Sequence, residues 1–207
     1  MTDALVLYTN PRSRGRIVRW MLEEIGCPYT TGIIDYAAMK GADYLAINPM
    51  GKIPALRHGN AVVTETAAIC AYLADAFPEA GLIPPVEDRA ARAAYYRWLF
   101  FCAGPVEAAN TNKVLGVEVP EDKRRFVGYG TYDDTIRALL TAVENREFVA
   151  GDRFTAADVY VGSHIAFGLE FGSLQPHPAF ERYAKAMRSR PAAVRAAQID
   201  DALLAAA

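Results

Sequence analysis

The chain has 207 residues, of which 52% are hydrophobic, so it is long and apolar enough to bury the core of one large domain or of two small ones. Its formal net charge of −2 gives no basic excess, which argues against a nucleic-acid partner. No apolar run reaches the ~18 residues that span a bilayer, and the first basic residues follow the N-terminal apolar stretch, the reverse of a signal peptide. We therefore expect a cytoplasmic protein that works on small molecules and has no membrane association.

The first 78 residues alternate strand and helix patterns. Short β-rich runs at residues 4–9 and 29–35 flank a segment whose apolar residues recur at helical spacing. A short helix follows, then two strands joined across a Gly-Asn turn, and then a helix that ends before Pro78. The predicted order over residues 1–78 is β-α-β-α-β-β-α, which is an α/β domain.

The remainder of the chain has a different pattern. Residues 79–88 contain two adjacent prolines and several polar residues, which indicates a linker. Beyond it, Ala-rich segments with an apolar residue at every third or fourth position predict an all-α domain over residues 89–207. Thr155 and Asp158 have the spacing of a capping box, so we assign them to helix nucleation and not to a ligand site.

Neither the cysteines nor the histidines are spaced like metal ligands. Cys27, Cys70 and Cys102 lie far apart and form no CxxC pair, and the three histidines are also scattered. This usage is typical of buried, reduced thiols and predicts neither a disulfide framework nor a metal site.

Four segments stand out by their order and spacing: LYTNPRSRGRIVRWMLEEIG, NPMGKIPAL, VVTETAAICAYL and FVAGDRFTAADVYV. Together they resemble the cytosolic glutathione transferases, and within that family the bacterial, serine-type members. The resemblance covers nearly the whole chain. It implies a thioredoxin-like N-terminal domain, an all-α C-terminal domain, a homodimer, glutathione as cosubstrate and a role in detoxification. The strand and helix order read from the first 78 residues agrees with the thioredoxin-like domain.

Pro54 stands at the head of a predicted strand, where a residue without an N–H suggests an edge, a bulge or a cis peptide bond. The resemblance implies a cis Ile53-Pro54 bond, with the backbone of Ile53 turned outward to pair with the cysteinyl backbone of glutathione. The alternative is a trans proline that only starts an edge strand. Lys52 could meet the glycyl carboxylate, although a lone lysine beside a loop is also a common solvated charge.

Glu65 and Thr66 lie where a strand ends and a helix begins, among the unpaired N–H groups of the helix start. Such a place attracts carboxylates. The resemblance implies that Thr66 and a free N–H hold the γ-glutamyl carboxylate of glutathione while Glu65 pairs with its ammonium. Ordinary capping of the helix, with no ligand, is the alternative.

The segment NPRSRGR begins the first predicted helix. The resembled family supplies glutathione as a thiolate, using a tyrosine, serine or cysteine near the end of the first strand. A hydroxyl donor and the positive end of a helix can together lower a thiol pKa, and this loop has no cysteine, so we expect Ser13 to be the catalytic donor. Alignment from the end of the helix shifts the register slightly, which leaves Arg14, Asn10, Tyr8 or a backbone N–H as alternatives. Ser13 could also simply cap the helix.

The aromatic stretch YYRWLFFCAG lies in the predicted all-α domain. Most of it is expected to be core. Phe101 and Cys102, just before a Gly-Pro break, are our candidates for the wall of the electrophile pocket.

Two functions from different classes follow. The first is an enzyme that adds glutathione to an electrophile or uses it to reduce a peroxide. The second is a noncatalytic glutathione-fold module that binds ligands or proteins. The presence of Ile53-Pro54 and of Glu65-Thr66 favours the first, while the sequence leaves the electrophile or peroxide open.

Overall fold

The computed structural model describes residues 4–206, which form two compact units. The first unit consists of residues 4–81 together with 189–206, and the second of residues 82–188. Each unit is described by itself below. No helix among residues 4–206 is both long enough and apolar enough to cross a bilayer.

The first unit is built on a four-stranded sheet with the spatial order β2-β1-β3-β4. The strands are β1 (Leu5–Thr9), β2 (Thr30–Ile33), β3 (Ala55–His58) and β4 (Ala61–Thr64). β1 runs parallel to β2 and antiparallel to β3, which in turn pairs antiparallel with β4. The predicted β-α-β-α-β-β-α domain is confirmed, since parallel β1 and β2 are joined by a helix and β3 and β4 by a tight turn.

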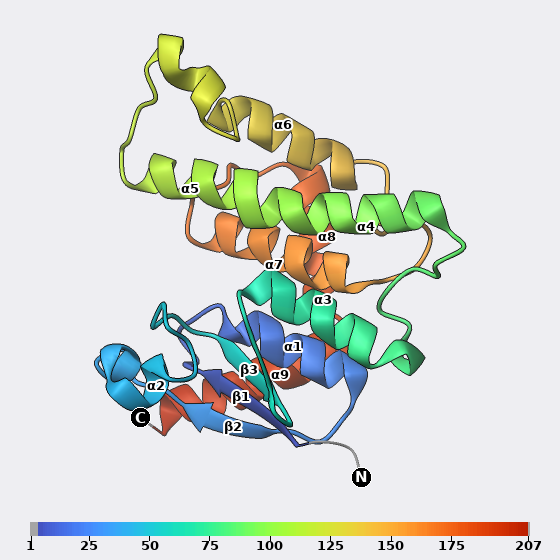
Figure 1. Ribbon diagram of the computed structural model, residues 1–207. Coiled ribbons are helices and arrows are strands. Elements are labelled where there is room, and N and C mark those ends of the chain that lie inside the picture. The colour runs from blue at the N-terminus through green and yellow to red at the C-terminus, as the bar shows by residue number, and fades with distance from the viewer. Residues whose placement is uncertain (1–3, 207) are drawn as a thin grey trace. The chain divides into compact units, whose positions relative to one another are not determined.

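Two helices of this unit, α1 (Gly15–Ile25) and α3 (Thr66–Ala76), contact the strands of the sheet, and both bury apolar side chains. The other helices are η1 (Ala38–Lys40), α2 (Ala42–Leu45), η2 (Pro78–Ala80) and α9 (Pro191–Ala205). Figure 1 shows α1 and α3 on the same side of the strands, and the two helices contact each other. Ile17, Met21 and Leu22 are fully buried on α1, which ends where Gly26 takes a left-handed conformation (φ 73°) that glycine adopts without strain.

The last helix belongs to the first unit, although the sequence analysis placed all of residues 89–207 in the helical domain. Helix α9 packs against α1, and charged side chains join the two helices along their length. The pairs are Arg16–Asp201, Arg19–Asp200, Arg195–Glu23 and Arg190–Glu24, at 2.8, 2.9, 3.2 and 2.7 Å. This set is called the α1–α9 seam below. A periodic apolar pattern identifies a helix but not its partner, so the sequence alone did not predict the seam.

The second unit contains only helices among its described residues. They are α4 (Arg89–Phe101), the π-helical turn η3 (Cys102–Val106), α5 (Glu107–Val114), η4 (Glu121–Phe126), α6 (Tyr132–Val143), α7 (Ala156–Glu170) and α8 (Pro178–Arg188). The turn η3 joins α4 to α5, which follow each other in Figure 1. It contains Pro105, and the regular α-helical hydrogen bonding is interrupted there because proline has no backbone N–H to donate. Helix α7 is buried along most of its length and packs against α4 and α8. The all-α fold of this region is confirmed.

The predicted capping box at the start of α7 is confirmed. The backbone N–H and the hydroxyl of Thr155 both donate to Oδ2 of Asp158, at 2.8 and 2.9 Å. Oδ1 of the same carboxylate accepts from the Val149 N–H at 2.8 Å and from the Tyr183 hydroxyl at 2.7 Å. Burial raises the pKa of Asp158, while these donors act in the opposite direction. A fully buried carboxylate with four donors holds a loop and two helices together.

Candidate functional site at one end of the sheet

The strand register brings three loops to the same end of the sheet. Ala55, the first residue of β3, lies opposite Tyr8 near the end of β1 and opposite Thr64 at the end of β4. The loop after β1, the segment before β3 and the turn after β4 therefore start from neighbouring positions. These segments carry Ser13, Ile53-Pro54 and Glu65-Thr66, so residues that are far apart in the sequence share one end of the first unit.

Ser13 is half-buried at the start of α1. Its hydroxyl donates to the backbone carbonyl of Asn10 at 2.7 Å and accepts from the Gly15 N–H at 3.0 Å. The Ser13 N–H also donates to the Asn10 carbonyl, at 2.9 Å. The Ser13 oxygen thus accepts the first N–H of α1 from the residue before the N-cap position, which Arg14 occupies. The hydroxyl proton of Ser13 is therefore directed to the Asn10 carbonyl.

Asn10 and Tyr8, two of the alternatives to Ser13, are engaged in holding the fold. The buried Asn10 amide donates to the Ile34 carbonyl at 3.1 Å and accepts from the Arg12 N–H at 3.0 Å, so it fixes the loop after β1. The centroid of the Tyr8 ring lies 6.4 Å from that of the Tyr44 ring. It also lies 5.3 Å from the guanidinium carbon of Arg57 on β3. Arg14, the remaining side-chain alternative, is exposed at the N-cap position of α1.

The Ile53-Pro54 peptide bond is cis in the structure. Within residues 4–206, the N–H and C=O of Ile53 have no hydrogen-bond partner, and the side chain is partly exposed. The preceding carbonyl, that of Lys52, accepts from the Tyr44 hydroxyl and from the Asn48 amide, both at 2.7 Å. This pair of bonds anchors the segment just before Ile53 and leaves the Lys52 side chain exposed.

Sequence reasoning missed Tyr44 and Asn48. The pKa of Tyr44 is raised to about 12, chiefly because burial disfavours the phenolate. The only sequence feature that could have pointed to them is a polar residue in a short helix just before the Ile-Pro pair. A pattern of residue types does not show which backbone carbonyl a side chain reaches.

The start of α3 has an unusual backbone. Glu65 has φ 66° and ψ 118°, and it is the only residue other than glycine with a positive φ in the described part of the chain. Such a conformation costs of order 1–3 kcal/mol for a residue with a side chain. The Glu65 side chain is exposed and forms no capping hydrogen bond, while Thr66 is buried. The first N–H groups of α3 are thus left without a side-chain cap.

The two candidates for the electrophile pocket lie in the second unit, at the junction of α4 and η3. Phe101 is half-buried and its ring packs edge-on against Trp98, with centroids 5.6 Å apart. Cys102 is fully buried, and burial raises the pKa of its thiol. A fully buried side chain contacts only protein, so of the two Phe101 has the surface to meet a ligand.

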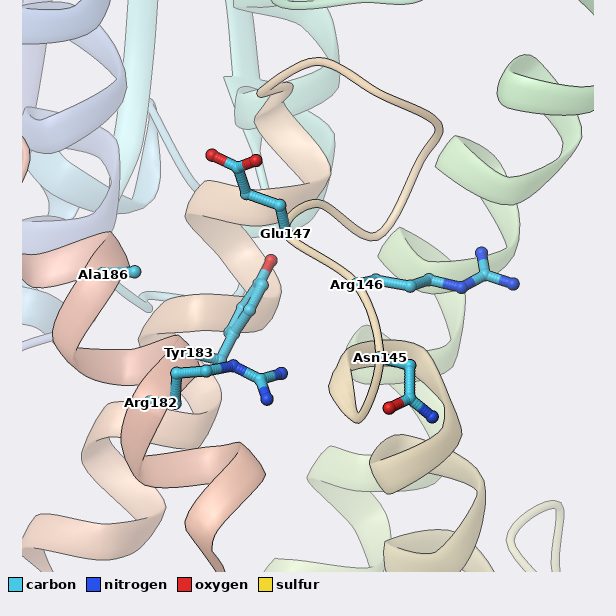
Figure 2. A pocket seen from close by; sticks show the side chains of 6 residues that line it. All are labelled: Asn145, Arg146, Glu147, Arg182, Tyr183 and Ala186. Carbon is cyan, nitrogen blue, oxygen red and sulfur yellow. The ribbon is translucent and has the colours of Figure 1, made fainter.

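A separate pocket of about 300 Å³ lies within the second unit and is shown in Figure 2. Its lining residues are Asn145, Arg146, Glu147, Arg182, Tyr183 and Ala186, and none of them is a predicted site residue. Arg182 donates to the Val143 and Glu144 carbonyls at the end of α6, and Tyr183 donates to Asp158. Both side chains therefore stabilise the helical unit, and we assign no chemistry to this pocket.

Comparisons with known proteins agree with this arrangement. Residues 13–76 match the family model for the glutathione S-transferase N-terminal domain. A glutathione S-transferase of Xanthomonas campestris is 31% identical over 162 residues, which cover 75% of this chain and 78% of that protein.

Solved structures resemble the whole chain. A glutathione transferase of Methylococcus capsulatus has a TM-score of 0.79 at 26% identity and covers 96% of this chain and 99% of its own. A glutathione transferase homologue from Sulfitobacter, with bound glutathione, has a TM-score of 0.74 at 27% identity and covers 95% and 98%. On the strength of these matches and of the fold, the chain belongs to the glutathione S-transferase family.

Proposed function

We propose that the protein is a glutathione transferase that binds glutathione at the end of the first unit's sheet and activates its thiol as a thiolate. The thiolate then adds to an electrophile or reduces a peroxide. The observation that carries the proposal is the convergence of three loops, each with a group suited to one part of the tripeptide. The glutathione bound to the Sulfitobacter homologue supports the choice of ligand.

We assign the recognition of glutathione to unpaired backbone groups and to charged side chains of the first unit. The unpaired N–H and C=O of Ile53, beside Pro54, suit the cysteinyl backbone, as in the addition of a strand to a sheet. The uncapped N–H groups of α3 and the Thr66 hydroxyl suit the γ-glutamyl carboxylate, and Glu65 suits its ammonium. Lys52, exposed beside this segment, is assigned to the glycyl carboxylate.

Activation requires a lower thiol pKa. A free thiol with a pKa near ~8.5 is mostly protonated at neutral pH, and lowering the pKa by ~2 units requires about 2.7 kcal/mol. Ser13 can supply part of this when its hydroxyl turns from the Asn10 carbonyl to the sulfur, because a bond to an anion is stronger than one to a neutral carbonyl. The positive end of α1 supplies a further part. We therefore assign the protein to the serine-type members of the family.

The remaining assignments follow from the family. We assign a homodimer, a cytoplasmic location, a role in detoxification, and a hydrophobic electrophile whose pocket is walled in part by Phe101. Residues 1–78 as the glutathione-binding domain and residues 79–88 as the linker stay predictions, and we assign the helical domain to the residues between that linker and α9.

The test is the thiolate absorbance of the glutathione complex, titrated against pH. In wild type we expect the bound thiol to ionise well below free glutathione. Ser13→Ala should raise its pKa by about one unit or more and slow turnover at neutral pH roughly 10-fold, while glutathione affinity changes little. Ser173→Ala, a partly buried serine of the second unit, is the matched control and should behave as wild type. Coincident curves for wild type and Ser13→Ala would move the role to Arg14, Asn10 or a backbone N–H.

One observation favours a noncatalytic ligand-binding module as the second candidate. The Ser13 proton is already donated to the Asn10 carbonyl, at 2.7 Å, and a hydroxyl that never leaves this acceptor activates no thiol. A wild-type complex whose thiol ionises no lower than that of free glutathione would favour this second function.

A further inference from the structure

Arg16 occupies an unfavourable place for a cation. It lies in the first turn of α1, where the helix dipole is positive and the turn itself contains no acidic residue. Its guanidinium is nonetheless fixed at both ends. Nη1 donates to the Pro11 carbonyl at 3.3 Å, and Nη2 donates to Oδ1 of Asp201 at 2.8 Å. The Arg16 side chain is 24% exposed and that of Asp201 64%.

The Pro11 carbonyl belongs to the loop that carries Ser13. This loop turns back on itself, because both the N–H and the hydroxyl of Ser13 donate to Asn10 and the Arg12 N–H donates to the Asn10 side chain. Arg16 adds a bond from outside the turn, at the residue between Asn10 and Arg12. Asp201 on α9 is thereby linked through one side chain to the loop.

We propose that Arg16 and Asp201 are a positioning pair through which the C-terminal helix α9 holds the Ser13 loop in its thiol-activating geometry. This inference rests on the proposed function, since loop position affects the thiol only where Ser13 is its donor. Neither residue contacts the sulfur in this account. The pair acts on the direction in which the Ser13 hydroxyl can point.

The rest of the α1–α9 seam explains why Asp201 is available at this place. Arg19 and Asp200, exposed by 1% and 0%, form a buried pair one turn further along α1 and fix the two helices against each other. The Arg195–Glu23 pair closes the opposite end, with exposed fractions of 51% and 17%. Arg195 therefore offers a matched control, because it joins the same two helices but lies at the end of α1 away from the loop.

Arg16 could act on the thiol through its charge or by holding the loop in position, and the two accounts predict opposite changes of the thiol pKa when Asp201 is removed. If Arg16 acted only as a positive charge, removing Asp201 would leave that charge uncompensated and lower the thiol pKa further. If Arg16 acts by holding the loop, removing Asp201 frees the guanidinium, loosens the Pro11 contact and raises the thiol pKa. The sign of the change therefore separates the two accounts.

The experiment compares wild type, Arg16→Met, Asp201→Ala and Arg195→Ala, each with bound glutathione. Two quantities are measured: the thiol pKa by thiolate absorbance, and the hydrogen exchange of the backbone amides of residues 10–16. We expect Asp201→Ala to raise the thiol pKa by roughly 0.3 to 0.7 of a pH unit, as the loss of one partly exposed ion pair allows. Exchange in the loop should become about two- to fivefold faster. Arg16→Met should show both changes at least as strongly, and Arg195→Ala neither.

A lowered or unchanged thiol pKa in Asp201→Ala, or equal effects of Asp201→Ala and Arg195→Ala, would overturn the inference. The proposed function is judged separately, by whether wild type lowers the thiol pKa at all. If it does not, the exchange of residues 10–16 still decides whether Asp201 holds the loop, and loop exchange that is the same in all four proteins would reject the pair.

Discussion

Two helix N-termini in this protein have similar sequences and opposite structures. Helix α7 begins with Thr155 and Asp158, whose side chains pair with each other and with the local backbone until every group is satisfied. Helix α3 begins with Glu65 and Thr66, where the backbone is strained and no side chain caps the first N–H groups. The first arrangement stabilises the fold, and the second leaves the N–H groups that the proposed glutathione site requires without a side-chain cap.

The difference teaches that local sequence identifies a helix start but not its use. Both places combine a threonine with an acidic residue, and both precede an apolar helix. What separates them is whether the carboxylate turns back to its own helix. At α7 the Asp158 carboxylate is fully buried with four donors, whereas at α3 the Glu65 carboxylate is exposed. A cap that is left incomplete at the cost of strain is the stronger indication of a binding site.

The largest effect that tests this contrast is on stability. Asp158→Ala leaves four buried donors without an acceptor, so we expect the free energy of unfolding to fall by about 3 to 5 kcal/mol. Urea unfolding followed by circular dichroism measures it. Asp152→Ala, at an exposed position six residues earlier, is the control and should stay within about 0.5 kcal/mol of wild type. A loss below about 1 kcal/mol in Asp158→Ala would contradict the structural role of the α7 start.

A smaller expected effect is the pH dependence of stability that Tyr44 causes. It tests whether a polar group at this end of the sheet stabilises the fold. Folding raises the pKa of Tyr44 from 10.0 to about 12, chiefly because burial of the phenol disfavours the charged phenolate. The stability that the protonated Tyr44 phenol contributes to the folded state is therefore fully present below pH 10 and is lost as the pH rises through about 12. Wild type should lose about 2 kcal/mol more stability than Tyr44→Phe over this window.

Unfolding in urea at a series of pH values measures the difference for Tyr44. Tyr96→Phe, which changes an exposed tyrosine of the second unit, should leave the wild-type pH dependence unaltered. Parallel pH profiles for wild type and Tyr44→Phe would show that the Tyr44 phenol is not buried as the structure has it.

Most of the architecture could be predicted from the sequence because it depends on local patterns. Strand and helix periods, the Gly-Asn turn and the capping box each act over a few residues, and the structure has all of them. The assignment of α9 could not be predicted, since its contacts with α1 include four ion pairs that join residues more than 160 positions apart. Charge pairing between distant helices leaves no periodic trace in one sequence.

The candidate site divides in the same way. Ser13, Pro54 and Glu65 could be proposed from the sequence because a hydroxyl before a helix, a proline before a strand and an acidic residue at a helix start have local meaning. Tyr44, which holds the Lys52 carbonyl, and Asp201, at the far end of the chain, were missed. Their roles depend on distances that only the folded chain defines.

The smallest effect is the most specific test of the strained helix start. Glycine adopts the Glu65 conformation freely, so Glu65→Gly should relieve strain and raise the free energy of unfolding by about 1 kcal/mol, after the larger entropy loss of glycine is subtracted. The same change removes the carboxylate assigned to the ammonium of glutathione and should weaken binding about fivefold. Glu65→Ala is the matched control, because it removes the carboxylate but keeps a Cβ at φ 66°. It should weaken binding to the same extent without any gain in stability. Urea unfolding and titration calorimetry on the two variants separate strain from recognition. A destabilised Glu65→Gly would mean that the backbone at Glu65 carries no relievable strain, and wild-type affinity in both variants would remove Glu65 from the site.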